Sequence, residues 1–269
     1  MNETRMVKDK FIFIAGPCVI ENKKLTFEIA KRLKDITSSY PIDFIFKASY
    51  DKANRTSISS YRGPGLVKGI KILEEIKRKL NIKILSDVHC RTEVKAVKDI
   101  LDVIQIPAFL SRQTDLIIEA AKSKKTINIK KAQFMSPYEM KYVIEKILST
   151  GNRNIFLTER GTSFGYQNLV VDFRSFLIMK EFGYPVIFDV THSLQEPASK
   201  DGVSGGRGEF AYPLALGGVA VGIDGLFMEV HPHPQLALSD KAITYPLFNV
   251  EKLIRRVIKL REVLNEEDR

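Results

Sequence analysis

The segment 47–59 concentrates side chains that bind anions. It follows the run 44–46, whose aromatic and β-branched residues predict a buried strand. Lys47 and Lys52 offer compact positive charges, and Arg55 offers a planar guanidinium that can hold a phosphate through paired hydrogen bonds. Neutral donors come from the same segment, namely Asn54, Thr56, Ser57 and Ser59. A solvated polar loop is the simpler interpretation of one such segment, but similar loops after other strands favour a binding site.

Cations also follow other predicted strands. With the three above they form one set: Lys47, Lys52, Arg55, Arg112, Lys130 and Arg160. Six cations on one face of a fold would repel each other unless anions occupied the space between them. The set therefore predicts one or two substrates that carry phosphate and carboxylate groups.

A second set offers metal ligands of mixed character: Cys18, His192, Glu229 and Asp240. A thiolate, an imidazole and two carboxylates suit a divalent transition ion such as Fe, Zn, Mn or Co better than Mg or Ca. A rival set exists, because Glu229, His231 and His233 alternate along an extended segment and could face one way. Spacing alone does not separate the two sets.

Short apolar runs alternate with amphipathic stretches from one end of the sequence to the other. The predicted strands lie near 11–15, 44–47, 83–88, 103–106, 126–130, 155–159, 186–190 and 225–230. The predicted helices lie near 24–38, 66–80, 92–100, 116–122, 138–148, 171–182, 210–221 and 250–264. Continuously apolar strands are buried on both faces, so the sheet is expected to be parallel and covered by helices. Eight βα units in 269 residues favour a single α/β domain, a closed (β/α)8 TIM barrel over residues 1–269.

In such a barrel the catalytic groups lie at the carboxyl ends of the strands. Polar residues do follow each predicted strand, among them Cys18, Lys47, Asp87 and His89, Gln105, Lys130, Lys131 and Gln133, Arg160, Asp189 and His192, and Glu229. One pocket shared by these loops is therefore expected. The glycine-rich stretch 202–208 is expected to be a mobile loop.

Composition narrows the class of protein. An apolar fraction of 44% and a charged fraction of 28% are typical of a soluble globular protein. The longest apolar stretch, 11–20, is about half of a membrane span, and no signal peptide is recognisable, so a cytoplasmic location without membrane insertion is expected. Two cysteines do not suggest a disulfide framework. The net charge of +10 comes with lysines interleaved with glutamates, the pattern of solvated helix faces, so we expect no nucleic-acid partner.

Ordered segments along nearly the whole chain resemble one enzyme family. They include IAGPCVIE, FKASYDKANRTS, IQIPAFLSRQTDL, NIKKAQFMSP, LTERGTSFGYQNLVVDFRS, FDVTHSLQ, SGGR, FMEVHPHP and ALSD. The chain thus resembles the 3-deoxy-D-manno-octulosonate-8-phosphate synthases, which condense phosphoenolpyruvate with arabinose 5-phosphate and water in lipopolysaccharide biosynthesis. It is less similar to the heptulosonate-phosphate synthases, which use erythrose 4-phosphate and carry Lys-Pro-Arg-Thr where this chain has Lys-Ala-Asn-Arg-Thr.

The resemblance implies roles for individual residues. It implies that phosphoenolpyruvate is bound by Lys47, Lys52, Gln105, Lys130 and Arg160, with His192 adjacent. Among these, it implies a catalytic part for Lys52, Lys130, Arg160 and His192. It also implies that the sugar is held by Asn54, Arg55 and Thr56, and that Arg112 reaches the sugar phosphate from a neighbouring subunit of a homotetramer.

The resemblance also bears on the metal. In the metal-dependent class a cysteine follows Gly-Pro, as Cys18 does here, whereas the metal-independent class has asparagine. This implies the ligand set Cys18, His192, Glu229 and Asp240 and disfavours the set with His231 and His233. The metal would either polarise the sugar aldehyde or lower the pKa of a bound water, and the residues do not choose between these roles.

Overall fold

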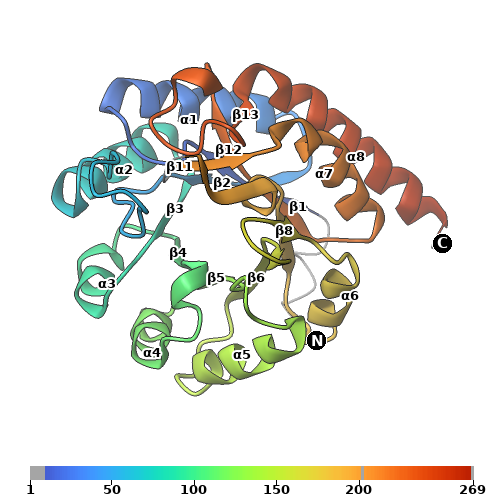
Figure 1. Ribbon diagram of the computed structural model, residues 1–269, viewed down its shortest axis with the longest axis horizontal. Coiled ribbons are helices and arrows are strands. Elements are labelled where there is room, and N and C mark those ends of the chain that lie inside the picture. Colours follow the sequence, from blue (N-terminus) through green and yellow to red (C-terminus); the bar gives the residue numbers. More distant parts are fainter. Residues whose placement is uncertain (1–9, 201–202, 268–269) are drawn as a thin grey trace.

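Eight parallel strands close into a barrel, and helices α1 to α8 surround it in chain order (Figure 1). The computed structural model describes residues 10–200 and 203–267. The barrel strands are β1 (Phe11–Gly16), β2 (Ile42–Lys47), β3 (Lys83–Asp87), β4 (Val103–Ile106), β5 (Thr126–Lys130), β6 (Ile155–Glu159), β9 (Val186–Asp189) and β12 (Gly225–His231). Each pairs in parallel with the next, and β12 pairs with β1 to close the ring. The predicted (β/α)8 TIM barrel is confirmed.

The helices lie close to their predicted positions. They are α1 (Lys23–Thr37), α2 (Leu66–Leu80), α3 (Arg91–Val97), α4 (Thr114–Lys122), α5 (Met140–Leu148), α6 (Arg174–Lys180), α7 (Ala211–Ala220) and α8 (Val250–Glu267). Asn22 caps α1, because its side chain accepts a hydrogen bond from the backbone N–H of Leu25 at 2.9 Å. The prediction 171–182 is too long for α6, whose N-cap is Phe173. Before it, the Asp172 carboxylate accepts the backbone N–H of Arg174, a local bond that competes with continuation of the helix.

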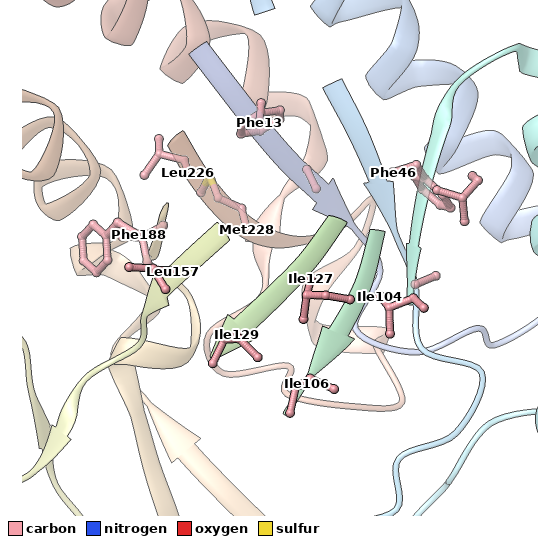
Figure 2. Packing of buried hydrophobic residues seen from close by; sticks show 14 of the residues in the cluster. Phe13, Phe46, Ile104, Ile106, Ile127, Ile129, Leu157, Phe188, Leu226 and Met228 are labelled. Atoms are coloured by element: carbon pink, nitrogen blue, oxygen red, sulfur yellow. The ribbon is translucent and has the colours of Figure 1, made fainter. Parts of the chain in front are cut away.

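Side chains alternate between two apolar regions of the barrel. Ile12 and Ile14 of β1 face the barrel interior with Ile45, Leu85 and Phe227. The residues between them face the helices and form the larger core, where Figure 2 shows Phe13, Phe46, Ile104, Ile106, Ile127, Ile129, Leu157, Phe188, Leu226 and Met228. This two-residue period follows from the pleat of the strand. It decides which residue at each strand end can reach the interior.

Additional strands that the sequence did not predict follow the carboxyl ends of three barrel strands. A hairpin of β7 (Thr162–Ser163) and β8 (Leu169–Val170) follows β6, and β13 (Tyr245–Pro246) extends the sheet beside β12. A second hairpin follows β9 and consists of β10 (Gln195–Lys200) and β11 (Val203–Gly206).

The prediction of a mobile loop at 202–208 is therefore wrong for Val203–Gly206, because these residues form strand β11. Residue 202 lies outside the described residues. A Cβ at Gly206 would lie 2.2 Å from Ile243 Cγ2 and 2.6 Å from the carbonyl oxygen of Leu194. Glycine is thus needed for β11 to pack this closely against the segment that follows β12. Among the described helices, none is both long and apolar enough to cross a membrane.

Candidate active site

A cavity of about 630 Å³ lies at the carboxyl ends of the barrel strands. Most of the predicted site residues line it: Lys47, Lys52, Asn54, Arg55, Thr56, Gln105, Lys130, Arg160, His192 and Asp240. Two further predicted residues, Cys18 and Glu229, are buried beside it and contact residues that line it. The expectation of one shared pocket is confirmed for the residues that line it, whereas Arg112 and Lys131 do not line it.

The alternation of the strands explains how the polar groups reach the cavity. The side chain two positions after each inward-facing residue also faces inward, at the open end of the barrel. Thus Ile45 of β2 is followed by Lys47, and Phe227 of β12 is followed by Glu229. The same step leads from Val103 to Gln105, from Asn128 to Lys130, from Leu85 to Asp87 and from Ile187 to Asp189. The side chains inside the barrel are thus mainly apolar at mid-strand and mainly charged at the carboxyl ends of the strands.

The ends of β1 and β2 approach each other closely. A Cβ at Gly16 would lie 2.0 Å from the carbonyl oxygen of Lys47, so only glycine fits there. The chain then turns through Pro17 and places Cys18 under the cavity, where its carbonyl oxygen accepts a hydrogen bond of 2.9 Å from Lys47 Nζ. Gly16 therefore sets the position of the Cys18 thiol.

Cys18, Glu229 and Asp240 form a cluster that could hold a metal ion. One ligand atom from each lies within 4.8 Å of the others. Cys18 Sγ lies 2.9 Å from Asp240 Oδ2 and 2.8 Å from Ser239 Oγ, so its single proton can be donated to either oxygen. Burial, with the negative charges of Asp240 and Glu229, raises the pKa of the Cys18 thiol well above its usual value. The buried Oε2 atom of Glu229 has no hydrogen-bond partner among the described residues, which fits a cation at this position.

His192 lies next to this cluster, although it is outside the group defined by the 4.8 Å limit. Its Nε2 lies 3.4 Å from Glu229 Oε1, and its Nδ1 lies 2.7 Å from Asp189 Oδ2. The rival ligands are placed differently. His231 Nε2 faces Glu21 Oε1 at 3.6 Å, and His231 Nδ1 lies 3.0 Å from the backbone nitrogen of His233.

Glu229 is the point on which two lysines converge. Lys47 Nζ lies 2.7 Å from Glu229 Oε1, and Lys52 Nζ lies 3.5 Å from the same oxygen. Burial raises the pKa of Glu229, but the charges of His192, Lys47 and Lys52 outweigh burial and hold the pKa far below its usual range. The carboxylate is therefore ionised and compensates part of the positive charge beneath the cavity.

Lys130 is almost fully buried at the end of β5. Its Nζ forms an ion pair with Asp189 and lies 3.1 Å from the centroid of the Phe227 ring. Burial lowers the pKa of Lys130 to about 8, despite the attraction of Asp189. Burial raises the pKa of Asp189, but the charges of His192 and Lys130 hold it well below its usual range. Lys130 is thus a cation that can lose its proton near neutral pH.

The part of the cavity wall that is formed by Arg160 and Gln105 has N–H groups that are free to donate hydrogen bonds. Arg160 is 5% exposed, and its Nη2 donates to Gln195 Oε1 at 2.7 Å, while its buried Nη1 has no partner among the described residues. Burial lowers the pKa of Arg160 below its usual value. Gln105 Oε1 accepts from Asn128 Nδ2 at 3.1 Å, which leaves the amide group of Gln105 free to donate. An anion at this wall would satisfy these donors.

The rim of the cavity carries the residues expected to hold a sugar. Asn54 and Thr56 are exposed. Arg55 Nε donates to the carbonyl oxygen of Tyr61 at 3.0 Å, and its buried Nη2 has no partner among the described residues. Arg112 is exposed and does not line the cavity of its own chain. Its carbonyl oxygen accepts a hydrogen bond of 3.1 Å from Lys146 Nζ, and its guanidinium forms no hydrogen bond or ion pair with the described residues.

The structure also brings groups to the cavity to which the sequence assigned no role. Asp189 joins Lys130 to His192, and Asp87 and His89 line the cavity beyond Lys52. Their position after a strand was visible in the sequence. For Asp87 and Asp189 the sequence does contain a signal, because each lies two positions after an apolar residue that faces the barrel interior.

The comparisons with known proteins were made on the whole sequence. The sequence model of the DAHP synthetase I family matches residues 5–266. The chain is similar to the 2-dehydro-3-deoxyphosphooctonate aldolase of Trichlorobacter lovleyi, at 51% identity over 253 residues that cover 94% of this chain and 93% of the relative. The corresponding protein of Geotalea uraniireducens is 53% identical over 246 residues, covering 91% and 90%. That of Fusobacterium nucleatum is 48% identical over 257 residues, covering 96% and 92%.

Proposed function

The chain belongs to the DAHP synthetase I family and, within it, to the 2-dehydro-3-deoxyphosphooctonate aldolases, and we propose that its cavity carries out their reaction. It condenses phosphoenolpyruvate with D-arabinose 5-phosphate and water to give 3-deoxy-D-manno-octulosonate 8-phosphate and inorganic phosphate. This is a step of lipopolysaccharide biosynthesis. The observation that carries the proposal is the row of buried cations and unused donors in one cavity, which suits substrates with several negative charges.

Phosphoenolpyruvate is assigned to the buried end of the cavity. Lys52, Lys130 and Arg160 supply positive charge there, and Gln105 supplies a neutral donor. Lys47 contributes mainly by holding Glu229 and the Cys18 carbonyl in place, since both contacts occupy its Nζ. Burial of these cations supports strong electrostatic binding, because water screens them little.

The sugar phosphate is assigned to the rim. Asn54, Arg55 and Thr56 offer donors that are not engaged with other side chains among the described residues. We assign Arg112 to the sugar phosphate of a neighbouring subunit in a homotetramer, since Arg112 does not line its own cavity. Sedimentation of the intact protein tests the assembly. Cys18 and Cys90 are both free, which supports a reducing, cytoplasmic location for this one catalytic domain.

The reaction joins the enol carbon of phosphoenolpyruvate to the aldehyde carbon of the sugar. Water adds to the neighbouring carbon, and phosphate leaves by cleavage of its carbon–oxygen bond. Lys52, Lys130 and Arg160 fix the enol phosphate and stabilise the charge that shifts during attack, and orientation supplies much of the rate. His192, held at Nδ1 by Asp189, presents Nε2 toward Glu229.

A divalent ion of the Fe, Zn, Mn or Co class fits the buried cluster, with Cys18, Glu229, Asp240 and the adjacent His192 as its ligands. The orphaned oxygen of Glu229 supports this assignment. When bound, such an ion polarises an oxygen or acidifies a water molecule. Cys18 and Asp240 would exchange their mutual hydrogen bond for contacts with the ion.

The first test measures release of phosphate from phosphoenolpyruvate as a function of added arabinose 5-phosphate, before and after chelation. We expect release that depends on the sugar, that chelation abolishes, and that a divalent ion restores. Release that survives verified metal removal would retain the reaction and reject the metal site. Release with erythrose 4-phosphate in place of arabinose 5-phosphate would contradict the assigned sugar.

A further inference from the structure

Four side chains form a continuous polar chain that starts at the cavity and ends in the core. Asp87 and His89 line the cavity, and Glu93 of α3 and Tyr50 lie behind them. Asp87 Oδ2 lies 3.0 Å from His89 Nε2, and Glu93 Oε2 lies 3.0 Å from His89 Nδ1. The hydroxyl of Tyr50 donates to the same Glu93 oxygen at 2.8 Å. None of these residues has a role in the proposed function described above.

The geometry fixes the protonation of His89. Each nitrogen of its ring faces an oxygen of an ionised carboxylate, and an ionised carboxylate only accepts hydrogen bonds. Both nitrogens must therefore carry a proton, which makes the ring an imidazolium. Burial opposes this charge, but the hydrogen bonds to Asp87 and Glu93 raise the pKa of His89 to about 10.

Glu93 is itself held from three directions. Its Oε2 accepts hydrogen bonds from the Tyr50 hydroxyl and from both the ring and the backbone N–H of His89, the last at 2.8 Å. Burial raises the pKa of Glu93, but these donors lower it below the usual value. Tyr50 is fully buried, and its ring meets the His89 ring edge to face, with centroids 6.1 Å apart. The Glu93 carboxylate is thus held in position against Nδ1 of His89.

We propose that Glu93 and Tyr50 are positioning residues that keep His89 as a fixed imidazolium against Asp87 in the wall of the cavity. The benefit rests on the proposed function. Asp87 brings a negative charge to a cavity that binds anions, and its buried Oδ1 has no partner among the described residues. The imidazolium offsets this charge, so that Asp87 can remain ionised and accept hydrogen bonds without repelling phosphoenolpyruvate.

Charged groups on several sides act on the members of this polar chain. Burial raises the pKa of Asp87, but His89, Lys52 and Lys47 hold it well below its usual range. Burial and the negative charge of Glu93 raise the pKa of Tyr50, so its hydroxyl remains a donor. Arg62, which is paired with Asp51, also feels the negative charge of Glu93, and the exposed Cys90 adjoins His89 in the chain. Removal of Glu93 is therefore the change that weakens the hold on the proton of His89 without altering a residue that lines the cavity.

The direct test is a titration of the histidine side chains by NMR in the intact protein and in Glu93→Gln, which retains the shape of the side chain and removes its charge. The chain has only 4 histidines, and His89→Asn assigns the signal. We expect His89 of the native protein to stay an imidazolium between about pH 6 and about pH 9, and to titrate within that range in Glu93→Gln. Tyr50→Phe should shift the titration in the same direction by less. Loss of the proton near about pH 6.5 in the native protein would overturn the proposal.

The second test separates a charge effect from a folding defect. In Glu93→Gln we expect the KM for phosphoenolpyruvate to match the native value at about pH 6 and to exceed it by about tenfold at about pH 9, with a smaller change in kcat. Each comparison is made at one pH, so the titration of Lys130 enters both proteins. Glu74→Gln, an exposed residue of α2 without a recorded ion pair among the described residues, is the control and should show no pH-dependent difference. A KM ratio that stays constant with pH would assign Glu93 a merely structural role. The NMR test decides the proposal even if the protein fails to condense these substrates.

Discussion

The two ends of the cavity are built on different principles. At the buried end, Lys47, Lys130 and Glu229 are at most 4% exposed, and each has a partner of opposite charge. At the rim, Asn54 and Thr56 are exposed, and their side chains form no hydrogen bond or ion pair with the residues that the structure describes. The buried end is therefore organised before any substrate enters, whereas the rim acquires its order from the substrate.

This difference corresponds to what each end has to do. Charge shifts during the reaction at the enol phosphate, and dipoles and charges that are already in place stabilise such a shift without reorganisation. A sugar phosphate needs to be held and oriented, and exposed donors on a loop can do this. Substitutions at the buried end should therefore lower kcat and folding stability, and those at the rim should mainly raise the KM for the sugar.

The largest effect is expected for Cys18→Ala. Loss of a metal ligand should abolish retention of the ion and lower turnover by more than about 100-fold, which exceeds the usual cost of losing only a supporting contact. Metal content after dialysis and phosphate release measure the two effects. The control is Cys90→Ser, since Cys90 is exposed and does not line the cavity. Near-native turnover of Cys18→Ala in verified metal-free buffer would contradict the assignment of Cys18 as a ligand.

Adjacent lysines allow a sharper comparison of function with stability. Lys130→Met should lower kcat/KM for phosphoenolpyruvate by about 100-fold or more, because it removes a buried charge from the cavity. Lys131 is equally buried but points away, with Nζ 3.1 Å from the Met135 carbonyl oxygen and 3.4 Å from Glu159 Oε1. Lys131→Met should instead lower the free energy of unfolding by about 3–5 kcal/mol. Steady-state kinetics and urea unfolding distinguish them, and equal kinetic losses in both variants would refute the distinction.

The pH dependence follows from Lys130. Its folded pKa of about 8 means that the cation is present below that pH and is lost above it. We therefore expect kcat/KM for phosphoenolpyruvate to fall by up to tenfold per pH unit above about pH 8. Lys130→Arg should remove this limb of the profile, since arginine stays charged. A native profile that stays level to about pH 10 would show that Lys130 is not the group that titrates.

The smallest effect is expected at the rim. Arg55→Ala should raise the KM for arabinose 5-phosphate by about 10- to 100-fold, as expected for loss of a charge-assisted hydrogen bond. The KM for phosphoenolpyruvate and the stability should change little, because within the described part of the chain the guanidinium makes one hydrogen bond. Initial rates with each substrate varied in turn provide the measurement. A parallel rise of both KM values would show that the two ends of the cavity are not independent.

Much of this architecture could be predicted because it depends on local pattern. The helix 66–80 begins and ends where its amphipathic period does, and the barrel strands are continuous apolar runs. The hairpins after β6 and β9 could not be predicted in this way. Strands β7 and β8 have two residues each, and β10 and β11 contain polar residues and glycine. Contacts with distant segments help to stabilise them, such as the hydrogen bond from Gln195 Nε2 to Asp240 Oδ1 at 2.7 Å.

Prediction of the site from the sequence has the same limit. The residue types and their places after strands predicted most of the charged groups that line the cavity, but not neighbours such as Tyr61 and Gln195. Which partner each group takes depends on distances across the barrel, and these are not encoded in spacing. The sequence therefore proposed His192 as a ligand but could not place its Nδ1 against Asp189, nor could it reveal that Glu93 and Tyr50 stand behind His89.

The hydrogen bond between Cys18 and Asp240 joins residues 222 positions apart, across the seam where β1 meets β12. During synthesis the ribosome delivers Cys18 long before Asp240. A growing chain can bury much of the apolar layer between its early strands and helices, yet it holds only a single member of this cluster until the last barrel strand has emerged. A cation bound at the seam would therefore be captured only after the barrel has closed, and a folding intermediate with an open seam would leave its thiol unprotected.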